Sequence, residues 1–442
     1  MLSLTGLVSL LAIGSESARA ATGYTHPTLK GRAALTPRWH SDNPQVTVHG
    51  STCTVEPLGG GLDDGPNLLY AFELCGENAL IELPGYYTVN TVLSTYLHNV
   101  EVRLQGAISY VPDIAYWSPA SIFMTYQNAT TYWFFSGDGV TLNGGGTIDA
   151  NGQTWWDYYT QNKATGRGVA GGSTRVFARP IPLTVGNATN VKIQDISVIN
   201  SPFWSNFVYQ SSNVEYDNIK IRAISANESA PAANSDGWDI YRSSHVYIHD
   251  SHVVNGDDCV SFKPNSTYMR VENMYCNGSH GISIGSLGQY AGETDIVSDI
   301  YVKNISMNNA ENGARIKVFA GSPDPNSVSG GGSGYVRNVT FEDFHCENCD
   351  NPILIDQCYQ TASTSCAQYP STLSISDVHY INVSGTSSGV VKNGTVATLK
   401  CSETCQDITA TGTDLRPPNG TAQYLCSNLA NESTLDFTCT HS

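Results

Sequence analysis

NVKIQDISVIN (190–200), NVEYDNIKIRA (213–223) and HVYIHDSHVVN (245–255) are three versions of one short pattern, and this pattern decides the fold. Each version alternates apolar and polar residues, as a half-buried strand does, and carries an Asn or Asp near its middle. Four later stretches repeat the pattern: YMRVENMYCN (268–277), DIYVKNISMNN (299–309), YVRNVTFEDFHCEN (335–348) and LSISDVHYINVSG (373–385). The chain is therefore expected to consist of many similar strand units.

The copies recur at a fairly regular distance. Successive anchors are 23, 32, 23, 31, 34 and 39 residues apart when the pattern is anchored on Asp195, Asn218, Asp250, Asn273, Asn304, Asn338 and Asp377. A period in the twenties, lengthened by insertions, is typical of solenoids. Strand-rich repeats with Gly and Asn corners predict an all-β, single-domain right-handed parallel β-helix. A β-sandwich with irregular loops would explain the strands but not the period.

The N-terminus has the features of an export signal. Residues 2–13 form a short apolar run, and residues 18–20 form a small-residue cleavage pattern, so residues 1–20 are predicted to be a secretory signal peptide. A buried N-terminal helix is the alternative, because the basic start of a signal peptide is missing. Residues 21–442 are predicted to form the β-helix domain, with 321–334 as a loop between two coils. No stretch has the roughly 18 consecutive apolar residues of a membrane span, so no membrane partner is expected.

Cysteines and glycosylation sequons agree with export. The chain has twelve cysteines, and Cys259 and Cys276, in adjacent coils, are predicted to form a disulfide. Cys53–Cys75 and Cys358–Cys366 follow by proximity, and Cys401–Cys405 and Cys426–Cys439 would tie down the C-terminal end. Cys346 and Cys349 remain and are paired by elimination, so the connectivity is not fixed. Eleven sequons are predicted N-glycosylation sites: Asn128, Asn187, Asn227, Asn265, Asn277, Asn304, Asn338, Asn382, Asn393, Asn419 and Asn431.

The net charge of −17 argues against nucleic acid as a partner. It would also oppose the binding of any acidic polymer, unless the chain provides a local cluster of basic residues. Solubility outside the cell is a second explanation of the acidic composition.

Four short segments contain chemically reactive residues, and the first three follow one another at the length of one coil. The segments are 234–239 (Asn-Ser-Asp-Gly-Trp-Asp), 256–259 (Gly-Asp-Asp-Cys), 278–281 (Gly-Ser-His-Gly) and 315–317 (Arg-Ile-Lys). Asp236 and Asp257 are 21 residues apart, and Asp258 and His280 are 22 apart, which is one short coil in each case. One coil advances a β-helix by roughly 4.8 Å, so residues one coil apart stack on the same face. The three aspartates and the histidine are therefore expected to form one compact cluster.

A carboxylate cluster of this kind suits glycoside hydrolysis. That reaction needs one protonated carboxyl, which donates to the leaving oxygen, and one ionised carboxylate, which activates water or attacks the sugar. Crowding raises the pKa of at least one carboxyl, and a neighbouring His can tune the cluster. Two alternatives remain. By themselves the two aspartate segments resemble ordinary turns, Gly-Ser-His-Gly a loop and Arg-Ile-Lys a solvated strand face. Three carboxylates could instead bind calcium.

Arg315 and Lys317 are two residues apart, which places both side chains on one face of a strand. Two cations on one face suit the carboxylate of a uronic acid, which arginine can bind in bidentate fashion. These residues would provide the local basic cluster that an acidic substrate requires.

Taken in order, the four segments resemble the hallmark motifs of the polygalacturonases, glycoside hydrolase family 28. Those motifs read Asn-Thr-Asp, Gly-Asp-Asp, Gly-His-Gly and Arg-Ile-Lys; here Ser235 replaces the Thr, and Ser279 precedes the His. The resemblance covers roughly residues 50–410. It implies a right-handed parallel β-helix and hydrolysis with inversion. By position, Asp257 matches the general acid, and Asp236 and Asp258 match the pair that activates water.

The resemblance assigns further roles. His280 matches a histidine that assists the acid, and Arg315 and Lys317 match the substrate-carboxylate binders. Tyr359 is aligned, more loosely, with a subsite tyrosine, and Asn234 is expected to orient the site. No metal and no organic cofactor is implied. The expected partner is polygalacturonate or pectin, and the protein is expected to be a secreted monomer.

The wording of several segments resembles fungal-type exopolygalacturonases, including VSFKPN (260–265) and SHGISIGSLGQY (279–290). Exo action requires loops that block one end of the cleft, and 158–182 and 321–334 are the candidates. The alternatives are an endopolygalacturonase and a hydrolase of xylogalacturonan or rhamnogalacturonan. A pectate lyase and a non-catalytic β-helix of the cell surface belong to other functional classes.

Overall fold

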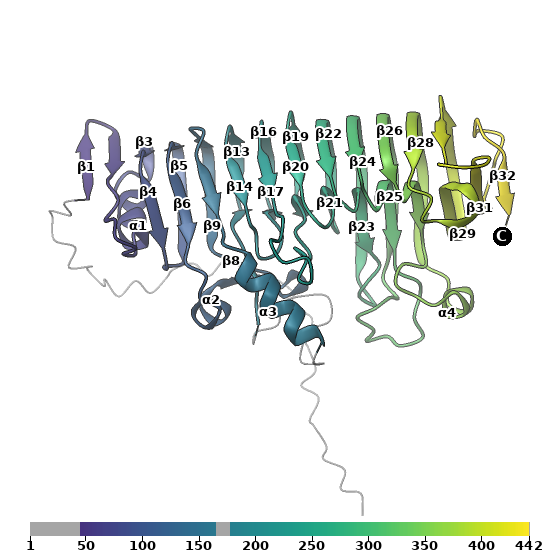
Figure 1. The fold of residues 1–442 in the computed structure, drawn as a ribbon, viewed down its shortest axis with the longest axis horizontal. Helices are drawn as coiled ribbons and strands as arrows, with labels where there is room; N and C mark the ends of the chain where they lie inside the picture. The colour runs from purple at the N-terminus through teal and green to yellow at the C-terminus, as the bar shows by residue number, and fades with distance from the viewer. Residues whose placement is uncertain (1–44, 165–176, 442) are drawn as a thin grey trace, which may run out of the picture. The chain divides into compact units, whose positions relative to one another are not determined.

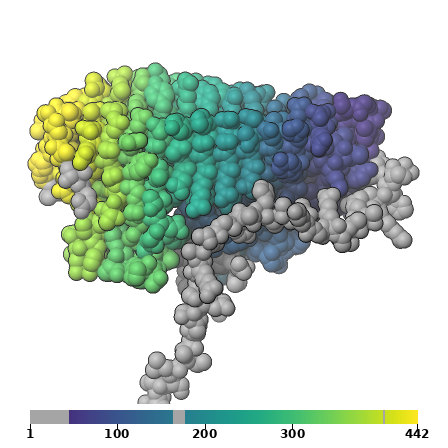
Figure 2. Space-filling model, turned by 180° about the vertical axis from the view of Figure 1, so that it is seen from behind, coloured from purple at the N-terminus to yellow at the C-terminus, as the bar shows by residue number. Residues whose placement is uncertain are grey.

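The computed structural model describes residues 45–164 and 177–441, which belong to one compact unit. The predicted signal peptide lies outside these residues. The described chain winds into successive coils, each contributing short strands that pair in parallel with the next coil (Figure 1). Seen from behind, the coils follow one another along the long axis in sequence order (Figure 2). The predicted parallel β-helix is confirmed.

The coils build three strand faces. The first face consists of β12 (Leu183–Gly186), β15 (Asn206–Tyr209), β18 (Trp238–Tyr241), β21 (Val260–Phe262), β23 (Ile282–Leu287), β25 (Asn312–Val318), β27 (Asn351–Asp356), β29 (Thr395–Thr411), β31 (Gln423–Leu429) and β32 (Cys439–His441). The second consists of β2 (Thr52–Val55), β3 (Glu77–Leu83), β5 (Leu93–Leu104), β9 (Trp133–Asn143), β13 (Thr189–Gln194), β16 (Ser212–Asp217), β19 (Ser244–His249), β22 (Ser266–Asn277), β24 (Thr294–Asn308), β26 (Ser333–Cys349) and β28 (Thr372–Ser387).

The third face consists of β4 (Tyr86–Val89), β6 (Ala107–Tyr110), β10 (Thr147–Asp149), β14 (Ser197–Ile199), β17 (Lys220–Arg222) and β20 (His252–Val254), and it continues through the ends of β22, β24, β26 and β28 to β30 (Asp414–Arg416).

Shorter elements decorate the coils. Strand β1 (Val46–His49) pairs antiparallel with β2, and β7 (Ile122–Phe123), β8 (Thr130–Thr131) and β11 (Pro180–Ile181) form a small separate sheet. The helices are α1 (Gly65–Leu74), α2 (Ile114–Ala120), α3 (Gln153–Ala164) and α4 (Ser363–Gln368), with 3-10 turns η1 (Tyr126–Asn128) and η2 (Lys392–Gly394). Among the described residues, no helix combines the length and the apolar character that crossing a membrane requires.

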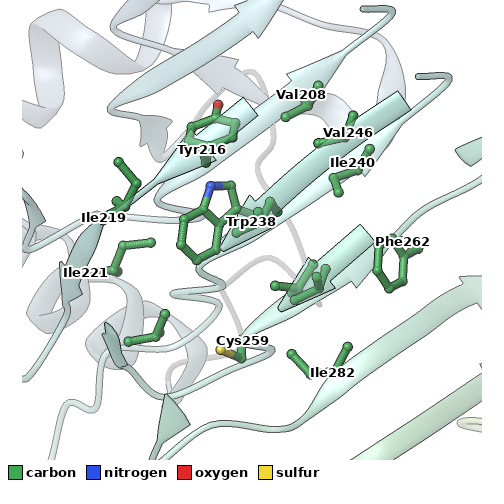
Figure 3. Close-up of a cluster of buried hydrophobic side chains, with 14 of the residues drawn as sticks. Val208, Tyr216, Ile219, Ile221, Trp238, Ile240, Val246, Cys259, Phe262 and Ile282 are labelled. Carbon is green, nitrogen blue, oxygen red and sulfur yellow. The ribbon is translucent and has the colours of Figure 1, made fainter. Parts of the chain in front are cut away.

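The core lies inside the coils and consists of side chains stacked in register. One column on the first face runs through Val208, Ile240 and Phe262 (Figure 3). It continues to Ile284, and each of the four residues is fully buried and one coil from the next. A second column on the same face contains Trp238 and, one coil later, Val260. Burying a large apolar side chain of this kind stabilises the fold by about 1.5–3 kcal/mol. This stacking fixes the register of the coils, and with it the positions of the turns that carry the site.

The recurring Asn and Asp residues form ladders at the corners between strands. Their φ angles lie near +50° to +60°, a left-handed conformation that Asn and Asp tolerate better than other side chains. Within one ladder, the Asn218 amide donates to Asp195 at 2.7 Å and the Asn273 amide donates to Asp250 at 2.9 Å. Each amide thus links its coil to the preceding one, which explains why the pattern recurs.

The predicted anchoring of the last repeats was wrong. The ladder that includes Asn304 continues one coil further at Asp343 and then at Asn382, which donates to Asp343 at 3.0 Å. Asn338 and Asp377 belong to a neighbouring ladder, in which the Asn338 amide donates to Asp299 at 2.7 Å. The physical reason is that each coil has more than one corner where the left-handed conformation is required.

Five of the six predicted disulfides are present: Cys53–Cys75, Cys259–Cys276, Cys358–Cys366, Cys401–Cys405 and Cys426–Cys439. The sixth pair was wrong, because Cys346 and Cys349 carry free, buried thiols. Both lie near the end of β26, where the pairing register with β28 is irregular. A buried free cysteine packs as a small apolar side chain, and here Cys349 Sγ also donates to the Met307 carbonyl at 3.7 Å.

The predicted surface features can be located in the described chain. Nine of the eleven sequon asparagines are exposed, and the other two, Asn265 and Asn277, are half-buried. Their glycosylation stays a prediction. Residues 321–334 form a loop that leads from β25 into β26, as expected. The stretch 158–182 starts inside α3 and ends at β11 and β12, and its central part, 165–176, lies outside the described residues.

Candidate active site

Successive coils bring the four sequence segments to one place on the first face. Asp236 lies two residues before β18, Asp258 two before β21 and His280 two before β23, and these strands pair in register. Arg315 and Lys317 lie in β25, the next strand of the face. Asp236, Asp257 and Asp258 each present a carboxylate oxygen, and the three oxygens lie within 4.8 Å of one another. The spacing in the sequence therefore located the cluster.

Asp258 is the carboxylate at the floor of the cluster. Its side chain is fully buried, and its oxygens accept hydrogen bonds from Lys317 Nζ at 2.6 Å and from Ser283 Oγ at 2.7 Å. Arg315 Nη1 lies 3.7 Å from Asp258 Oδ1. Burial alone would raise the pKa of Asp258, but the charges of Lys317 and Arg315 outweigh it and lower the pKa. Asp258 is therefore ionised.

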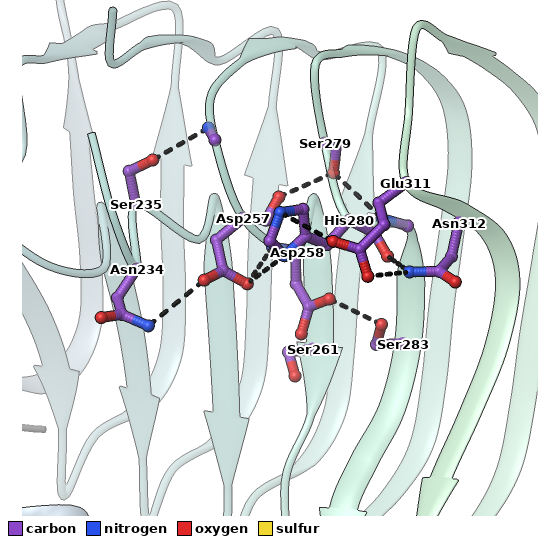
Figure 4. Close-up of polar contacts among 12 residues, drawn as sticks. Asn234, Ser235, Asp257, Asp258, Ser261, Ser279, His280, Ser283, Glu311 and Asn312 are labelled. Atoms are coloured by element: carbon purple, nitrogen blue, oxygen red, sulfur yellow. Dashed lines mark hydrogen bonds and ion pairs between the residues drawn. The ribbon is translucent and has the colours of Figure 1, made fainter. Parts of the chain in front are cut away.

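Asp257 is the most accessible of the three, with a side chain that is 17% exposed. Its Oδ1 accepts a hydrogen bond from the backbone N–H of Asp258 at 2.8 Å and lies 3.2 Å from His280 Nδ1 (Figure 4). Its Oδ2 accepts a hydrogen bond from the side-chain amide of Asn234 at 3.2 Å. Burial would raise the pKa of Asp257, but the hydrogen bond and charge of His280 and the charge of Lys317 lower it. Asp257 is thus also ionised in the free protein.

Asp236 completes the cluster and differs from the other two. It is 3% exposed, and its Oδ1 has no hydrogen-bond partner among residues 45–164 and 177–441. Burial, followed by repulsion from Asp239 and Asp257, raises its pKa well above the usual range. The free cluster therefore stores a proton, and Asp236 holds it most strongly. Because the carboxyls interact, this proton belongs to the cluster rather than to one residue alone.

His280 borders the cluster on the side of the following coil. Burial would lower the pKa of His280, but Asp257 and Glu311 outweigh this effect and raise the pKa to about 8. Its Nε2 lies 3.4 Å from Glu311 Oε2. The histidine is therefore a cation at neutral and acidic pH.

Tyr359 contributes an aromatic ring above the two basic residues. Its ring centroid lies 5.4 Å from the Arg315 guanidinium carbon and 5.6 Å from Lys317 Nζ. Both cations are buried to more than nine-tenths. The looser alignment of Tyr359 therefore corresponds to a ring that contacts both predicted carboxylate binders.

Sequence reasoning missed an arginine that supports Asn234. Arg179 is fully buried and donates to Asn234 Oδ1 at 2.7 Å and to the Ala233 carbonyl at 2.7 Å. Its guanidinium lies 4.2 Å from the centroid of the Tyr159 ring. Arg179 thus fixes the amide that binds Asp257, and no sequence signal connects residues 55 positions apart.

A second missed group is a buried ion pair beside Asp236. Lys263 Nζ lies 2.9 Å from Asp239 Oδ1, with side chains 6% and 0% exposed. Burial raises the pKa of Asp239 to about 7, against the opposing charge of Lys263. Lys263 also lies 5.4 Å from the Trp204 ring. The site therefore contains a fourth carboxyl, that of Asp239, and Lys263 is a further cation that balances it.

Segments outside the coils cover the first face on the N-terminal side of the site. The Tyr126 ring of η1 stacks on Tyr241 with centroids 3.9 Å apart, and it packs with Trp204 and Phe207 in one buried aromatic cluster. Figure 1 shows β8, α2 and α3 grouped on this side, with α4 on the other. We call residues 122–131, which carry η1, the N-terminal wall. Gln127 of this wall donates to Gln289 at 3.1 Å.

The loop 321–334 lies on the C-terminal side of the same face. Its Gly330 amide donates to the Gln289 carbonyl at 2.7 Å, and Gln289 Nε2 donates to the Val328 carbonyl at 3.3 Å. Gln289 thus joins this loop to the N-terminal wall, which sequence reasoning did not identify.

Comparisons with known proteins agree with this geometry. Residues 81–435 match the family model described as "Glycosyl hydrolases family 28". The chain is 42% identical over 411 residues to an exopolygalacturonase of Cochliobolus carbonum, covering 91% of this chain and 87% of that protein. It is 41% identical over 406 residues to exopolygalacturonase X of Aspergillus niger, covering 90% of each.

A solved structure resembles this one over most of its length. The endo-xylogalacturonan hydrolase of Aspergillus tubingensis matches with a TM-score of 0.78 and 32% sequence identity, covering 88% of this chain and 99% of that one. On the family match and on the identity to its relatives, the chain belongs to the glycosyl hydrolases of family 28.

Proposed function

We propose that this protein is an exopolygalacturonase, which hydrolyses α-1,4-galacturonosidic linkages in polygalacturonate and releases galacturonic acid. The observation that carries the proposal is the contact between two clusters. The three-carboxylate cluster lies against Arg315 and Lys317, whose charges suit a uronate carboxylate. The exopolygalacturonases among its relatives support the same substrate.

In the proposed reaction, Asp257 donates a proton to the glycosidic oxygen as the bond from that oxygen to the anomeric carbon breaks. Asp236 and Asp258 orient a water molecule and accept one of its protons while its oxygen bonds to the anomeric carbon. The exposure of Asp257 supports its role, because it is the carboxyl that a glycosidic oxygen reaches first, whereas Asp236 and Asp258 lie deeper in the floor.

The distribution of protons in the free protein differs from that in the reactive form. Asp236 holds the stored proton and Asp257 is ionised, whereas the reaction needs the reverse. Both arrangements contain one proton within carboxyls whose oxygens lie within 4.8 Å. The reactive form thus requires only that this proton moves within the cluster when the substrate binds.

Inversion at the anomeric carbon depends on where the attacking water is held. Acid and base are usually about 6.5–9.5 Å apart in inverting glycosidases and about 5–5.5 Å apart in retaining ones, so a separation within 4.8 Å does not fit the inverting rule. That rule describes two carboxylates. Here the water is proposed to bind against Asp236 and Asp258 together, rather than between the acid and a single base.

The N-terminal wall supports exo action. Tyr126 covers Phe207 of β15 and Tyr241 of β18, and Asp236 lies in the turn just before β18. A polysaccharide lying along the first face could not continue past this point. The chain end would therefore stop at the site, which favours cleavage of a terminal unit.

A proton NMR time course on polygalacturonate tests the activity. We expect galacturonic acid as the sole product from the first minutes, with the β-anomer appearing first and the α-anomer following by mutarotation. A ladder of oligomers would overturn exo action, and α-anomer first would remove the water-activating role of Asp236 and Asp258. Unsaturated products that absorb in the ultraviolet and vanish with a chelator would identify a lyase instead.

Opening the N-terminal wall is expected to change the products. Replacing residues 124–129 by a short Gly-Ser linker removes Tyr126 and its cover over β15 and β18. Oligomers longer than the monomer should then appear early on polygalacturonate, as chromatography of the products would detect. Shortening the loop 321–334 is the matched control. If that change, and not the first, produces oligomers, the wall lies on the other side of the site.

A xylogalacturonan hydrolase is the second candidate, because the solved structure with a TM-score of 0.78 is an endo-xylogalacturonan hydrolase. Parallel assays on xylogalacturonan and on unsubstituted polygalacturonate separate the two functions. We further propose that the protein is secreted and acts as a monomer. Export is supported by the apolar residues 2–13 and by five disulfides, a number typical of oxidising compartments.

A further inference from the structure

We propose that Glu311 is a positioning residue, which holds His280 as a cation against Asp257 and so sets the upper end of the pH range in which the enzyme works. The proposal rests on the function proposed above, since it assumes that Asp257 is the acid. It assigns a role to a residue outside the four sequence segments.

Glu311 is fixed beside His280 by its backbone and by its neighbour. It lies between β24 and β25, and its amide donates to the Ser279 carbonyl at 2.8 Å. The Asn312 amide donates both to Glu311 Oε1 at 3.2 Å and to the His280 carbonyl at 3.1 Å (Figure 4). Asn312 itself is 1% exposed. The carboxylate is therefore tethered to the histidine it faces, although its side chain is 48% exposed.

The imidazole lies between two carboxylates. Nδ1 is 3.2 Å from Asp257 and Nε2 is 3.4 Å from Glu311. A neutral imidazole has one N–H, so it can donate to only one of these groups, whereas the cation donates to both. The arrangement is thus complete only when His280 carries its second proton.

The charges around His280 favour that proton from two coils. Asp257 and Asp258 face it from the turn before β21, and Glu311 faces it from the turn before β25. The cations of β25 do not cancel this effect, because Lys317 and Arg315 are directed at Asp258. The resulting rise in the pKa of His280, to about 8, agrees with the geometry.

This charge matters for turnover because His280 is the cation nearest to the acid. When His280 is protonated, it donates to Asp257 and to Glu311 at once, which holds the Asp257 carboxyl in place to receive the stored proton from Asp236 and pass it to the leaving oxygen. When His280 loses its proton, it can donate to only one of the two carboxylates, Asp257 loses this anchor and hydrolysis falls. Glu311 contributes by delaying that loss as the pH rises.

The size of the effect follows from the exposure of Glu311. A half-exposed charge such as that of Glu311 stabilises a cation about 4 Å away by about 1 kcal/mol in water. This corresponds to a rise of about half to one unit in the pKa of His280. Removing the charge of Glu311 should move the descending limb of the pH profile of kcat/KM without abolishing activity. A residue with a purely structural role would not move that limb selectively.

The experiment compares Glu311→Gln, which keeps the shape but not the charge, with Glu311→Asp, which keeps the charge. Glu347→Gln removes an exposed carboxylate from β26 and is the matched control. We expect Glu311→Gln to move the descending limb of kcat/KM to lower pH by about half to one unit, with the ascending limb and the KM at acidic pH unchanged. Glu311→Asp should recover at least half of the shift, and Glu347→Gln should match the wild type.

A direct titration gives a second readout that needs no substrate. In protein with ¹⁵N-labelled histidine, the His280 signal, assigned by its absence in His280→Gln, should titrate at lower pH in Glu311→Gln by the same amount. An unshifted signal would overturn the proposal, and so would a shifted signal with an unmoved activity limb, or an equal shift in Glu347→Gln. Failure of the proposed function would look different, since His280 would still titrate as expected while Asp257→Asn kept its activity.

Discussion

Replacing Asp257 by Asn is expected to lower kcat on polygalacturonate by a factor of roughly 10²–10⁴, the usual contribution of general acid catalysis. The amide has nearly the same shape and can still contact Asn234 and His280, but it has no carboxyl proton to give. Release of reducing sugar at acidic pH measures the effect.

The control for this variant is Asp414→Asn, which neutralises a carboxylate that is 61% exposed and far from the site in sequence. It should leave kcat unchanged, and both variants should keep the thermal unfolding midpoint of the wild type within a few degrees. Undiminished sugar release by Asp257→Asn would exclude Asp257 as the acid. Asp236, which holds the stored proton in the free cluster, would then be the next residue to replace.

Replacing Lys317 by Met is expected to lower the free energy of unfolding by about 3–5 kcal/mol near neutral pH, and to abolish most activity. The change leaves Asp258 fully buried without the ammonium group that lies 2.6 Å from its Oδ2. A buried carboxylate that loses its partner must either remain charged at high cost or take up a proton. In either case it can no longer activate water as proposed.

The effect should depend on pH in a defined direction. In the wild type, folding lowers the pKa of Asp258. The ionised Asp258 therefore stabilises the fold fully above its pKa in the unfolded chain, about 3.9. This stabilisation is lost as the pH falls through the lower pKa of the folded protein. The difference in the free energy of unfolding between wild type and Lys317→Met should therefore be largest near pH 7 and should become smaller below about pH 4.

Urea unfolding at several pH values measures this gap. Arg416→Met breaks an exposed pair with Asp414, whose side chains are 72% and 61% exposed, and should cost less than about 1 kcal/mol. Two outcomes would contradict a stabilising pair between Lys317 and Asp258. The free energy of unfolding could fall equally in the two variants, or its fall in Lys317→Met could be the same at every pH.

The aspartate cluster could be predicted because spacing in a solenoid translates directly into position. Asp258 and His280 are 22 residues apart, and the strands that follow them pair in register, so counting residues was enough to stack them. The ladders were harder to assign. Asn304 and Asn338 both adopt the left-handed conformation, yet they occupy different corners of their coils, and the sequence has no mark that distinguishes one corner from another.

The residues that were missed act across coils and have no motif. Lys263 meets Asp239 from the following coil, and Glu311 meets His280 from the following coil, so neither contact joins residues that are close in sequence. The wall around Tyr126 comes from a segment more than 100 residues before Asp236, and nothing in its composition indicates that it covers the cleft. Cys346 and Cys349 were paired by elimination, and burial made that pairing unnecessary.

The coil is also the unit in which such a protein can change during evolution. Each coil contacts mainly the one before and the one after, so a segment inserted at a corner leaves the register of the stacked columns intact. The catalytic floor comes from four consecutive strands of the first face, β18, β21, β23 and β25, while the segments that limit access to it leave the coils elsewhere. Descendants of one gene can therefore exchange the way they cut a polymer, from its end or from within, by gaining or losing a surface segment, while the chemistry is inherited unaltered.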